Sequence, residues 1–325
     1  MPGTRLSRQV VVVGSANLDL TVIASRLPRA GETVLGGELR LSSGGKGANQ
    51  AVAALRAGAE VRLLTKIGCD PFGDRIYQDL VAAGLPADGL LRDESAPTGV
   101  ALIVIDRQGR NQIAVAPGSN RLLLPEVIAQ YEPFLTHGTV ILVQLEIPTV
   151  TVERALRFAK AHRMTTILNP APACPLSDDM LRHIDLLTPN ETEAEVLTGI
   201  AVSDLPSAEA AAKALLLRGP QAIIVTLGAR GALLCTGSVA RHLPAIPVEA
   251  VDTTTAGDAF NGALAAAMAA KPQTEPLDPD ALSVLEDAVR FANAAGALAT
   301  TKRGAQESLP TRDEIERLLT GISVP

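Results

Sequence analysis

Aromatic residues make up only 2% of this 325-residue chain, and tryptophan is absent. A core of the size that this length allows must therefore be built mainly from Ala, Leu, Val and Ile. The scarcity of aromatic side chains also argues against stacking platforms for single-stranded nucleic acid. The net charge is −6 and no basic run is present, which argues against broad contact with a phosphate backbone. We therefore expect no nucleic acid among the partners.

Cysteine, histidine and long apolar runs are also scarce. The three cysteines, Cys69, Cys174 and Cys235, form no CxxC pair, which argues against a disulfide framework and fits a reducing compartment. The four histidines show no metal-ligand spacing. The apolar run Val10–Val13 is too short for a secretory signal, and no uninterrupted apolar stretch reaches the roughly 18 residues of a membrane span. We expect a soluble, cytoplasmic protein with no membrane partner.

The chain does contain a regular alternation of apolar β-type runs and helical segments. This alternation is typical of an α/β protein with a doubly wound, mainly parallel central sheet and helices on both faces. We expect one such domain over residues 1–325, with the Pro-rich segment 271–280 as a surface connection. Strands are predicted at 10–13, 61–68, 140–144, 165–168, 184–188 and 222–226, and helices at 46–58, 70–84, 149–163, 191–198 and 207–218.

Two irregular β-rich stretches, about 17–43 and 98–116, do not fit this alternation. The second has the pattern of a hairpin, with two β-rich runs around "DRQGR". Because both stretches adjoin core elements, we expect them to meet as a small β-sheet lid over one edge of the main sheet. Two unrelated surface hairpins are the alternative.

Polar clusters follow several of the predicted strands, at the carboxyl ends where ligands bind in open α/β sheets. Taken alone, each cluster has a simpler explanation. The "GGKGANQ" segment lacks the Walker A spacing, and Asp258 on a first helical turn would by itself stabilise that helix. Together they predict one elongated site. The clusters are Asn17 with Asp19, "GGKGANQ" (44–50), "QLE" (144–146), "TPNETEAE" (188–195), "TLGARG" (226–231) and "TTTAGD" (253–258).

In this order the clusters closely resemble the PfkB carbohydrate kinase family. "GGKGANQAVAA" is similar to the first family signature and "DTTTAGDAFNGAL" to the second. "NPAPA" (169–173), "TPNETEAE" and "KRGAQES" (302–308) resemble the members that phosphorylate ribose. The resemblance spans about Val10 to Leu319. It implies ATP-dependent phosphorylation of D-ribose at O5.

The resemblance implies that Asp258 is the catalytic base, which takes the proton of the sugar's primary hydroxyl. The backbone N–H groups of Thr255, Ala256, Gly257 and Asp258, at a helix N-terminus, would hold the transferred phosphoryl group. A carboxylate beside an anion site is then no contradiction, since the carboxylate faces the sugar and the amides face the phosphate. The sugar-binding residues implied in the same way are Asn17, Asp19, Gly45, Lys46, Asn49, Glu146 and Asp258.

Nucleotide and cation sites are also implied by the resemblance. Asn190 and Glu193, which match the family's NxxE element, would organise Mg²⁺, mainly through water because Mg²⁺ dehydrates reluctantly. A monovalent cation, K⁺, would order the 255–258 turn without touching substrate. The nucleotide residues would be Asn190, Thr226, Gly228, Gly231, Gly257 and Asn293, the last at the adenine. The K⁺ residues would be Asp252, Thr254, Ala299, Lys302, Gly304 and Ser308, several through backbone carbonyls alone.

Two residues depart from the family pattern: Thr255 stands where the signature prefers Ala, Gly or Ser, and Lys302 replaces the usual Arg. Other substrates remain open, namely deoxyribose, fructose or a nucleoside, although few aromatic residues are available to hold a base. A glycosidase of related fold and a non-catalytic sugar-binding regulator are further alternatives, which the intact "AGD" and "NETE" elements disfavour. An exposed β edge in the lid favours a homodimer.

Overall fold

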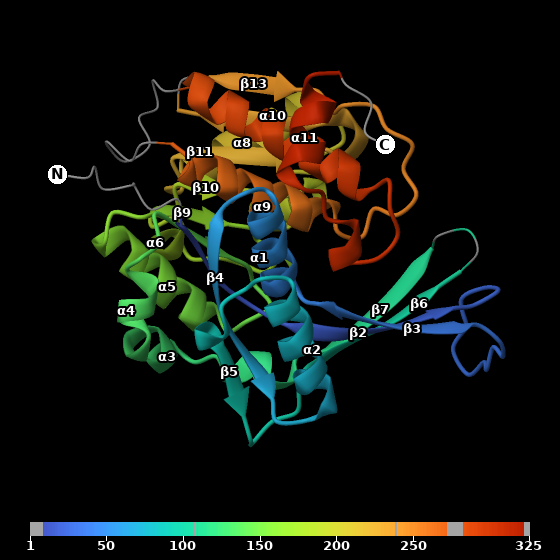
Figure 1. The fold of residues 1–325 in the computed structure, drawn as a ribbon. Coiled ribbons are helices and arrows are strands. Elements are labelled where there is room, and N and C mark those ends of the chain that lie inside the picture. Colours follow the sequence, from blue (N-terminus) through green and yellow to red (C-terminus); the bar gives the residue numbers. More distant parts are fainter. Residues whose placement is uncertain (1–8, 107, 109, 238, 272–281, 322–325) are drawn as a thin grey trace.

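The computed structural model describes residues 9–321 except 107, 109, 238 and 272–281, and these residues form two β-sheets (Figure 1). The larger sheet has nine strands in the order β13-β12-β11-β10-β9-β8-β1-β4-β5. Its pairs are parallel except for β11 with β12 and β12 with β13. The strands are β1 (Gln9–Val13), β4 (Glu60–Gly68), β5 (Leu90–Asp93), β8 (Val140–Val143), β9 (Thr165–Leu168), β10 (Leu186–Leu187), β11 (Ala222–Thr226), β12 (Ala232–Thr236) and β13 (Ala240–Leu243).

Helices cover both faces of this sheet, as the sequence predicted (Figure 1). One face packs against α1 (Lys46–Arg56), α2 (Pro71–Ala82), α9 (Ala256–Ala269), α10 (Leu282–Ala299) and α11 (Arg312–Leu319). The other packs against α3 (Pro125–Gln130), α4 (Glu132–Leu135), α5 (Thr149–Ala161), α6 (Asp178–Leu181), α7 (Glu191–Thr198) and α8 (Leu205–Leu216). The expected doubly wound, mainly parallel α/β architecture is confirmed.

The run of four valines in β1 shows how the sequence dictates this arrangement. Successive side chains of a strand point to opposite faces of the sheet. Val10 and Val12 lie in the hydrophobic cluster of one face and Val11 and Val13 in that of the other, and all four are fully buried. A strand covered on both faces must therefore be apolar at every position, which is why it lacks alternation.

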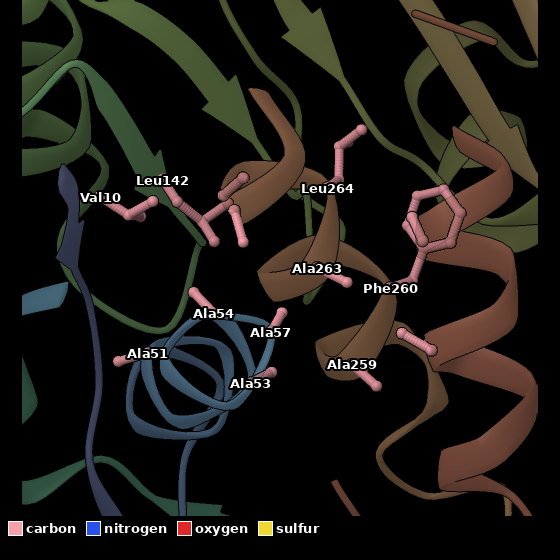
Figure 2. Packing of buried hydrophobic residues seen from close by; sticks show 14 of the residues in the cluster. Val10, Ala51, Ala53, Ala54, Ala57, Leu142, Ala259, Phe260, Ala263 and Leu264 are labelled. Carbon is pink, nitrogen blue, oxygen red and sulfur yellow. The ribbon is translucent and has the colours of Figure 1, made fainter. Parts of the chain in front are cut away.

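The helices nearest the candidate site pack through alanine and glycine. Figure 2 shows Ala53 of α1 and Ala57, directly after that helix, turned towards Ala259 and Ala263 of α9. A Cβ atom added to Gly262 would lie 2.4 Å from the Ala53 Cβ and 2.6 Å from the Gln50 carbonyl oxygen. The small residues thus let the backbones of α1 and α9 approach closely, and the core is filled without bulky aromatic side chains.

The smaller sheet is formed by the two stretches that did not fit the alternation. Its strands, in the order β3-β2-β6-β7, extend away from the helical body (Figure 1). Asn17 of β2 lies opposite Gly44 of β3 and Gly99 of β6, so the two stretches pair directly and are not unrelated hairpins. The strands are β2 (Asn17–Ile23), β3 (Glu38–Gly44), β6 (Gly99–Ile105) and β7 (Asn111–Ala116).

Some predicted boundaries were wrong. The strand predicted at 184–188 is reduced to β10, because the Asp185 carboxylate accepts the Thr166 N–H at 2.8 Å and the Thr166 hydroxyl at 3.1 Å. Helix α1 ends at Arg56, two residues before Gly58 adopts a φ of 93°. The predicted connection 271–280 lies, apart from Lys271, outside the described residues. Within the described part of the chain, no helix combines the length and apolar character needed to cross a membrane.

Candidate active site

The residues predicted to bind the sugar, here called the sugar-side residues, meet where β1 passes into β2 and where α1 begins. Gly45 precedes α1 with a φ of 87°, and a Cβ there would lie 2.7 Å from the Asn17 backbone nitrogen. A Cβ on Gly44 would lie 2.3 Å from an Asp19 carboxylate oxygen. Both glycines are therefore required for the close approach of these two segments. The structure brings Asn17, Asp19 and Gly45 together as predicted.

Asp258 lies on the first turn of α9 and is only 7% exposed. Its two carboxylate oxygens accept hydrogen bonds from the amides of Asn49 and Gln50, each at 3.0 Å. Burial raises the pKa of Asp258 above its usual value, against the opposing effects of Lys46 and the two amides. The Asn49 Oδ1 atom is buried and has no protein partner, so it is free to accept a sugar hydroxyl.

Lys46 and Glu146 complete the charged part of the site. A Glu146 carboxylate oxygen accepts the Lys46 backbone N–H at 3.0 Å and the Ser15 hydroxyl at 2.5 Å. Burial acts to lower the pKa of Lys46, but the carboxylates of Asp258, Glu146 and Glu193 outweigh it and the pKa is raised. Lys46 therefore remains charged among these carboxylates.

Asp19 faces the same carboxylates, and among the described residues no basic side chain pairs with it. Burial, followed by repulsion from Glu146, Asp258 and Glu307, raises its pKa to about 7. An ordinary aspartate in the unfolded chain has the value 3.8. Between these two pH values the folded protein holds a proton that the unfolded chain has released, so stability decreases as the pH rises through this window.

We therefore expect Asp19→Asn to raise the melting temperature of the ligand-free protein, and by more at pH 8 than at pH 5. The variant lacks the ionisation that destabilises the folded wild type, so its advantage should grow up to about pH 7 and then stay constant. Thermal denaturation from pH 5 to 8 measures it.

Glu32→Gln is the matched control for this experiment. The pKa of Glu32 is lowered to about 2, first by the hydrogen bond from Arg26, so it titrates below the pH range used. Its melting-temperature difference from wild type should be constant between pH 5 and 8. An equally constant difference for Asp19→Asn would contradict the assigned pKa.

Asn190 and Glu193 form a capping box at the start of α7. The Asn190 side chain accepts the Glu193 N–H at 2.8 Å, and Glu193 accepts the Asn190 N–H and side-chain amide, both at 2.9 Å. Burial raises the pKa of Glu193, and its electrostatic coupling to Lys46 and Asp258 shows that it belongs to the same charged site.

This pair fits a magnesium ion held through water. No group of three or more His, Cys, Asp or Glu residues among those described could form a metal cage. Mg²⁺ in phosphoryl-transfer sites keeps several waters and takes few protein ligands. Because each Glu193 oxygen already accepts one hydrogen bond, a second lone pair on each remains for a metal-bound water.

Most of the predicted nucleotide residues lie around the end of β11 and the loop that follows it. Thr226, at the end of β11, forms a parallel bridge with Asn190, and Gly228 and Gly231 follow with φ values of 56° and 92°. Asn293 of α10 lies beside this loop, because its side-chain amide donates to the Leu243 carbonyl at 3.1 Å and a Cβ added to Gly231 would lie 2.2 Å from the same oxygen. This bond uses one amide proton of Asn293, so a contact with adenine would have to use the second amide proton or the side-chain oxygen.

The turn before α9 carries the predicted anion site. The first-turn N–H groups of a helix have no partner within it. The Ala256 N–H, however, already reaches the Thr253 carbonyl at 3.3 Å. A Cβ added to Gly257 would meet nothing within 4 Å, so that side of the turn is open. Of the four predicted donors, Ala256 is thus the one whose N–H is already engaged.

Most of the residues predicted to bind K⁺ lie close to the turn that precedes α9. Asp252 accepts the Thr254 N–H at 3.0 Å and hydroxyl at 2.5 Å, and the Gly304 N–H approaches it at 3.4 Å. The N–H groups of residues 251 and 252 donate to the Thr300 carbonyl, next to Ala299. Oxygen atoms on short turns are suitable ligands for a hard cation.

Two members of this set behave differently. The Lys302 ammonium group donates to Glu314 at 2.8 Å, so a contribution from Lys302 is restricted to its backbone. The Ser308 hydroxyl donates to the Ala305 carbonyl at 2.8 Å, and it lies 2.7 Å from the hydroxyl of Thr255. The Thr255 hydroxyl therefore forms a buried pair with Ser308 that joins the turn before α9 to the 306–308 segment.

Several polar residues of the site were not assigned from the sequence. The Asn120 amide donates to the Asn17 side chain at 2.7 Å and its oxygen accepts the Ala16 N–H at 2.9 Å, which fixes the orientation of Asn17. Four more, which connect to Asp258 and its turn, are Gln50, Asn169, Thr188 and Asn261. "NPAPA" contains Asn169, but no pattern indicated its partner.

A cleft of about 1010 Å³ lies between the smaller sheet and the segments that precede α9 and follow α10. One wall is the face of the smaller sheet that carries Asp19, Thr21 and Ile103. The other wall consists of segments 250–254 and 303–307. Asp19 therefore connects the sugar-side residues with a cleft large enough for a small molecule.

The fold and site together define a kinase-type α/β enzyme, with a buried carboxylate beside a helix N-terminus. A family model described as pfkB family carbohydrate kinase matches residues 7–312. The ribokinase of Haemophilus influenzae is 38% identical over 309 residues, which cover 95% of this chain and 97% of that protein. The deoxyribokinase of Salmonella typhi is 36% identical over 312 residues, which cover 96% and 98%.

Solved structures agree with this assignment. The structure of Arabidopsis thaliana ribokinase complexed with ribose and ATP has a TM-score of 0.86 at 30% identity, and the match covers 96% of this chain and 99% of that one. The chain therefore belongs to the PfkB carbohydrate kinase family, and it is an enzyme that transfers phosphoryl groups.

Proposed function

We propose that the protein transfers the γ-phosphoryl group of ATP to O5 of D-ribose, giving D-ribose 5-phosphate and ADP. The observation that carries the proposal is the buried Asp258 carboxylate, held by two amides on the turn that opens α9. Similarity to ribokinases over nearly the whole chain supports the sugar. Deoxyribose is the second candidate, since a deoxyribokinase is almost as similar.

In the proposed reaction, Asp258 accepts the proton of the sugar hydroxyl as its oxygen attacks the γ-phosphorus and the bond to the ADP oxygen breaks. Asn17, Asp19 and Glu146 orient the sugar through its other hydroxyls. Lys46 and the N–H groups of Gly257 and Asp258 balance the negative charge of the phosphates. Mg²⁺, when bound near Asn190 and Glu193, would supply further charge neutralisation. K⁺ would rigidify the turn from the far side.

The smaller sheet acts, in this proposal, as the lid of a single domain. Its strand β2 carries Asp19, and its inner face forms one wall of the cleft. Closure over the cleft would exclude water from the phosphoryl transfer. An ATP-dependent reaction also fits the cytoplasmic location expected from the sequence.

We further propose that two copies of the chain pair through the outer face of this lid. By register, Val22, Leu39 and Leu102 lie on the face opposite Asp19, and they are 36%, 58% and 53% exposed. A two-sided sheet with an apolar outer face needs cover. Leu102→Asp is expected to convert a dimer to a monomer, as measured by light scattering after size exclusion, because it would bury unpaired charges in the interface.

Leu217→Asp is the control, since Leu217 is 91% exposed at the end of α8, far from the lid. It should leave the mass unchanged. A wild type that is monomeric at micromolar concentration, or a Leu102→Asp protein that stays dimeric, would contradict pairing through this face.

The function itself is tested by ADP release from MgATP with D-ribose, deoxyribose, fructose and adenosine in parallel, each with and without K⁺. We expect the highest kcat/KM with ribose and an increase on adding K⁺. A preference for deoxyribose would support the proposed kinase activity but change the proposed sugar substrate. If none of these four acceptors supports ADP release from ATP, the proposed substrate class is refuted.

A further inference from the structure

Five buried amide and hydroxyl side chains form a connected set of hydrogen bonds beneath the first turn of α9. We name this set the buried amide chain. None of its members was assigned a contact with the sugar, the nucleotide or a cation, although three of them lie in the polar clusters that predicted the site. The members, none more than 6% exposed, are Gln50, Gln144, Asn169, Thr188 and Asn261.

Gln50 of α1 is the member that touches the catalytic base. Its amide nitrogen donates to the Asp258 Oδ1 atom and to the Asn169 Oδ1 atom, both at 3.0 Å. Its amide oxygen accepts from the Gln144 side chain at 2.6 Å. Both side-chain protons of the fully buried Gln50 are thus used, and one of them points at the base.

The other end of the chain reaches the residue next to the base. The Asn169 amide donates to the Thr188 carbonyl at 3.2 Å, and the Thr188 hydroxyl donates to the Asn261 side-chain oxygen at 2.6 Å. The Asn261 amide then donates to the Gly257 carbonyl at 2.8 Å. Because an ionised carboxylate and a carbonyl can only accept, the two ends fix the orientation of every amide between them.

We propose that Gln50 is a positioning residue for phosphoryl transfer, which holds the Asp258 carboxylate in one orientation and in its ionised form. This inference rests on the proposed function. Asn49 and Gln50 each occupy one lone pair on a different carboxylate oxygen, and the remaining lone pairs are left for the sugar hydroxyl. A hydrogen bond to the charged form of a buried acid favours that form.

The other charges that act on Asp258 do not involve Gln50. They are Lys46 on α1, Glu146 after β8, Asp19 on β2 and Glu193 on α7. Since these groups stay in place when Gln50 is replaced, a change in the titration of Asp258 would report the lost amide.

Gln50→Met removes both donors at nearly constant side-chain shape. We expect the acid limb of the kcat–pH profile to move about one unit towards higher pH, so that kcat at a fixed pH on this limb falls about tenfold, as for loss of a hydrogen bond to a charged group. The KM for ATP should stay within about twofold. Gln50→Glu, which places a second acid beside Asp258, should move the limb in the same direction and serves if Gln50→Met does not fold.

Gln144→Met is the matched control, because it removes a hydrogen bond of the same kind to Gln50 without touching Asp258. Its acid limb should coincide with that of the wild type. If both Gln50 variants lower the melting temperature but leave the acid limb in place, Gln50 is merely structural and the proposal is wrong. Absence of ribose turnover in the wild type would instead count against the proposed function.

A second readout does not need turnover. Burial raises the pKa of Asp258, so the folded protein loses stability as the pH rises through the titration of this group. If Gln50 supports the ionised form, Gln50→Met should lose more stability than the wild type between pH 5 and 8. Asp258→Asn in the same background should remove that extra loss. Parallel stability curves for wild type and Gln50→Met would overturn the inference independently of activity.

Discussion

Asp258→Asn is expected to lower kcat with ribose by about a thousandfold, the middle of the range that a positioned general base contributes. Asparagine keeps the size of the side chain but cannot take the proton of the attacking hydroxyl. Sugar binding should survive, because Asn17, Asp19 and Glu146 approach from other elements. Steady-state kinetics and calorimetric titration with ribose measure the two effects separately.

The pH profile of the wild type provides a second test of the same assignment. Because burial raises the pKa of Asp258, kcat should rise with pH along a limb that lies above the range of an ordinary aspartate. Asp19, with a pKa of about 7, should affect kcat/KM for ribose and not kcat. A loss of less than tenfold in Asp258→Asn at pH values above this limb would mean that Asp258 is not the base.

Gly257→Ala is expected to abolish most ATP-dependent turnover, by about a hundredfold or more in kcat/KM for ATP, while the protein stays folded. A Cβ at Gly257 meets no protein atom within 4 Å, and alanine favours a helix by about 1 kcal/mol over glycine. The new methyl group would instead occupy space that the proposed phosphate needs beside the turn. Thermal denaturation should show equal or greater stability.

Gly262→Ala, one turn further along α9, is the matched comparison. There the Cβ would lie 2.4 Å from Ala53 and 2.6 Å from the Gln50 carbonyl, so overpacking should cost about 1–3 kcal/mol of stability. Gly257→Ala is thus expected to lower activity with ATP without loss of stability, and Gly262→Ala to lower stability. Normal ATP kinetics in Gly257→Ala would show that no phosphate approaches this turn.

Much of the architecture could be predicted from the sequence because the main strands are short apolar runs separated by helical segments. Val10–Val13 and Ala222–Val225 are examples in which burial on both faces leaves no polar position. The helix predicted at 70–84 does begin there, with Asp70 as its N-cap, which accepts the Gly73 N–H at 2.8 Å. The strand at Ile184–Thr188 was overestimated, since a buried carboxylate inside the run competes for the hydrogen bonds of the ladder.

The candidate site was predicted through its motifs, and the structure adds what motifs do not record. The contact of Gln50 with Asn169 joins residues 119 positions apart, and that with Asp258 joins residues 208 apart. No local periodicity indicates such pairs. In addition, a buried glutamine in an Ala-rich helix is easily taken for an exposed position until the neighbouring helix is in place.

Strand β2 begins at Asn17, carries Asp19, and is an interior strand of the smaller sheet, paired with β3 and β6 along its whole length. Asn17 and Asp19, two of the proposed sugar-binding residues, therefore lie on the same strand as the proposed lid. Under the proposed function, a substitution at the far end of the sheet that tilts β2 should change the affinity for ribose without contacting it. Ribose affinity would then report the position of the lid, and a lid variant with altered affinity would need no second explanation.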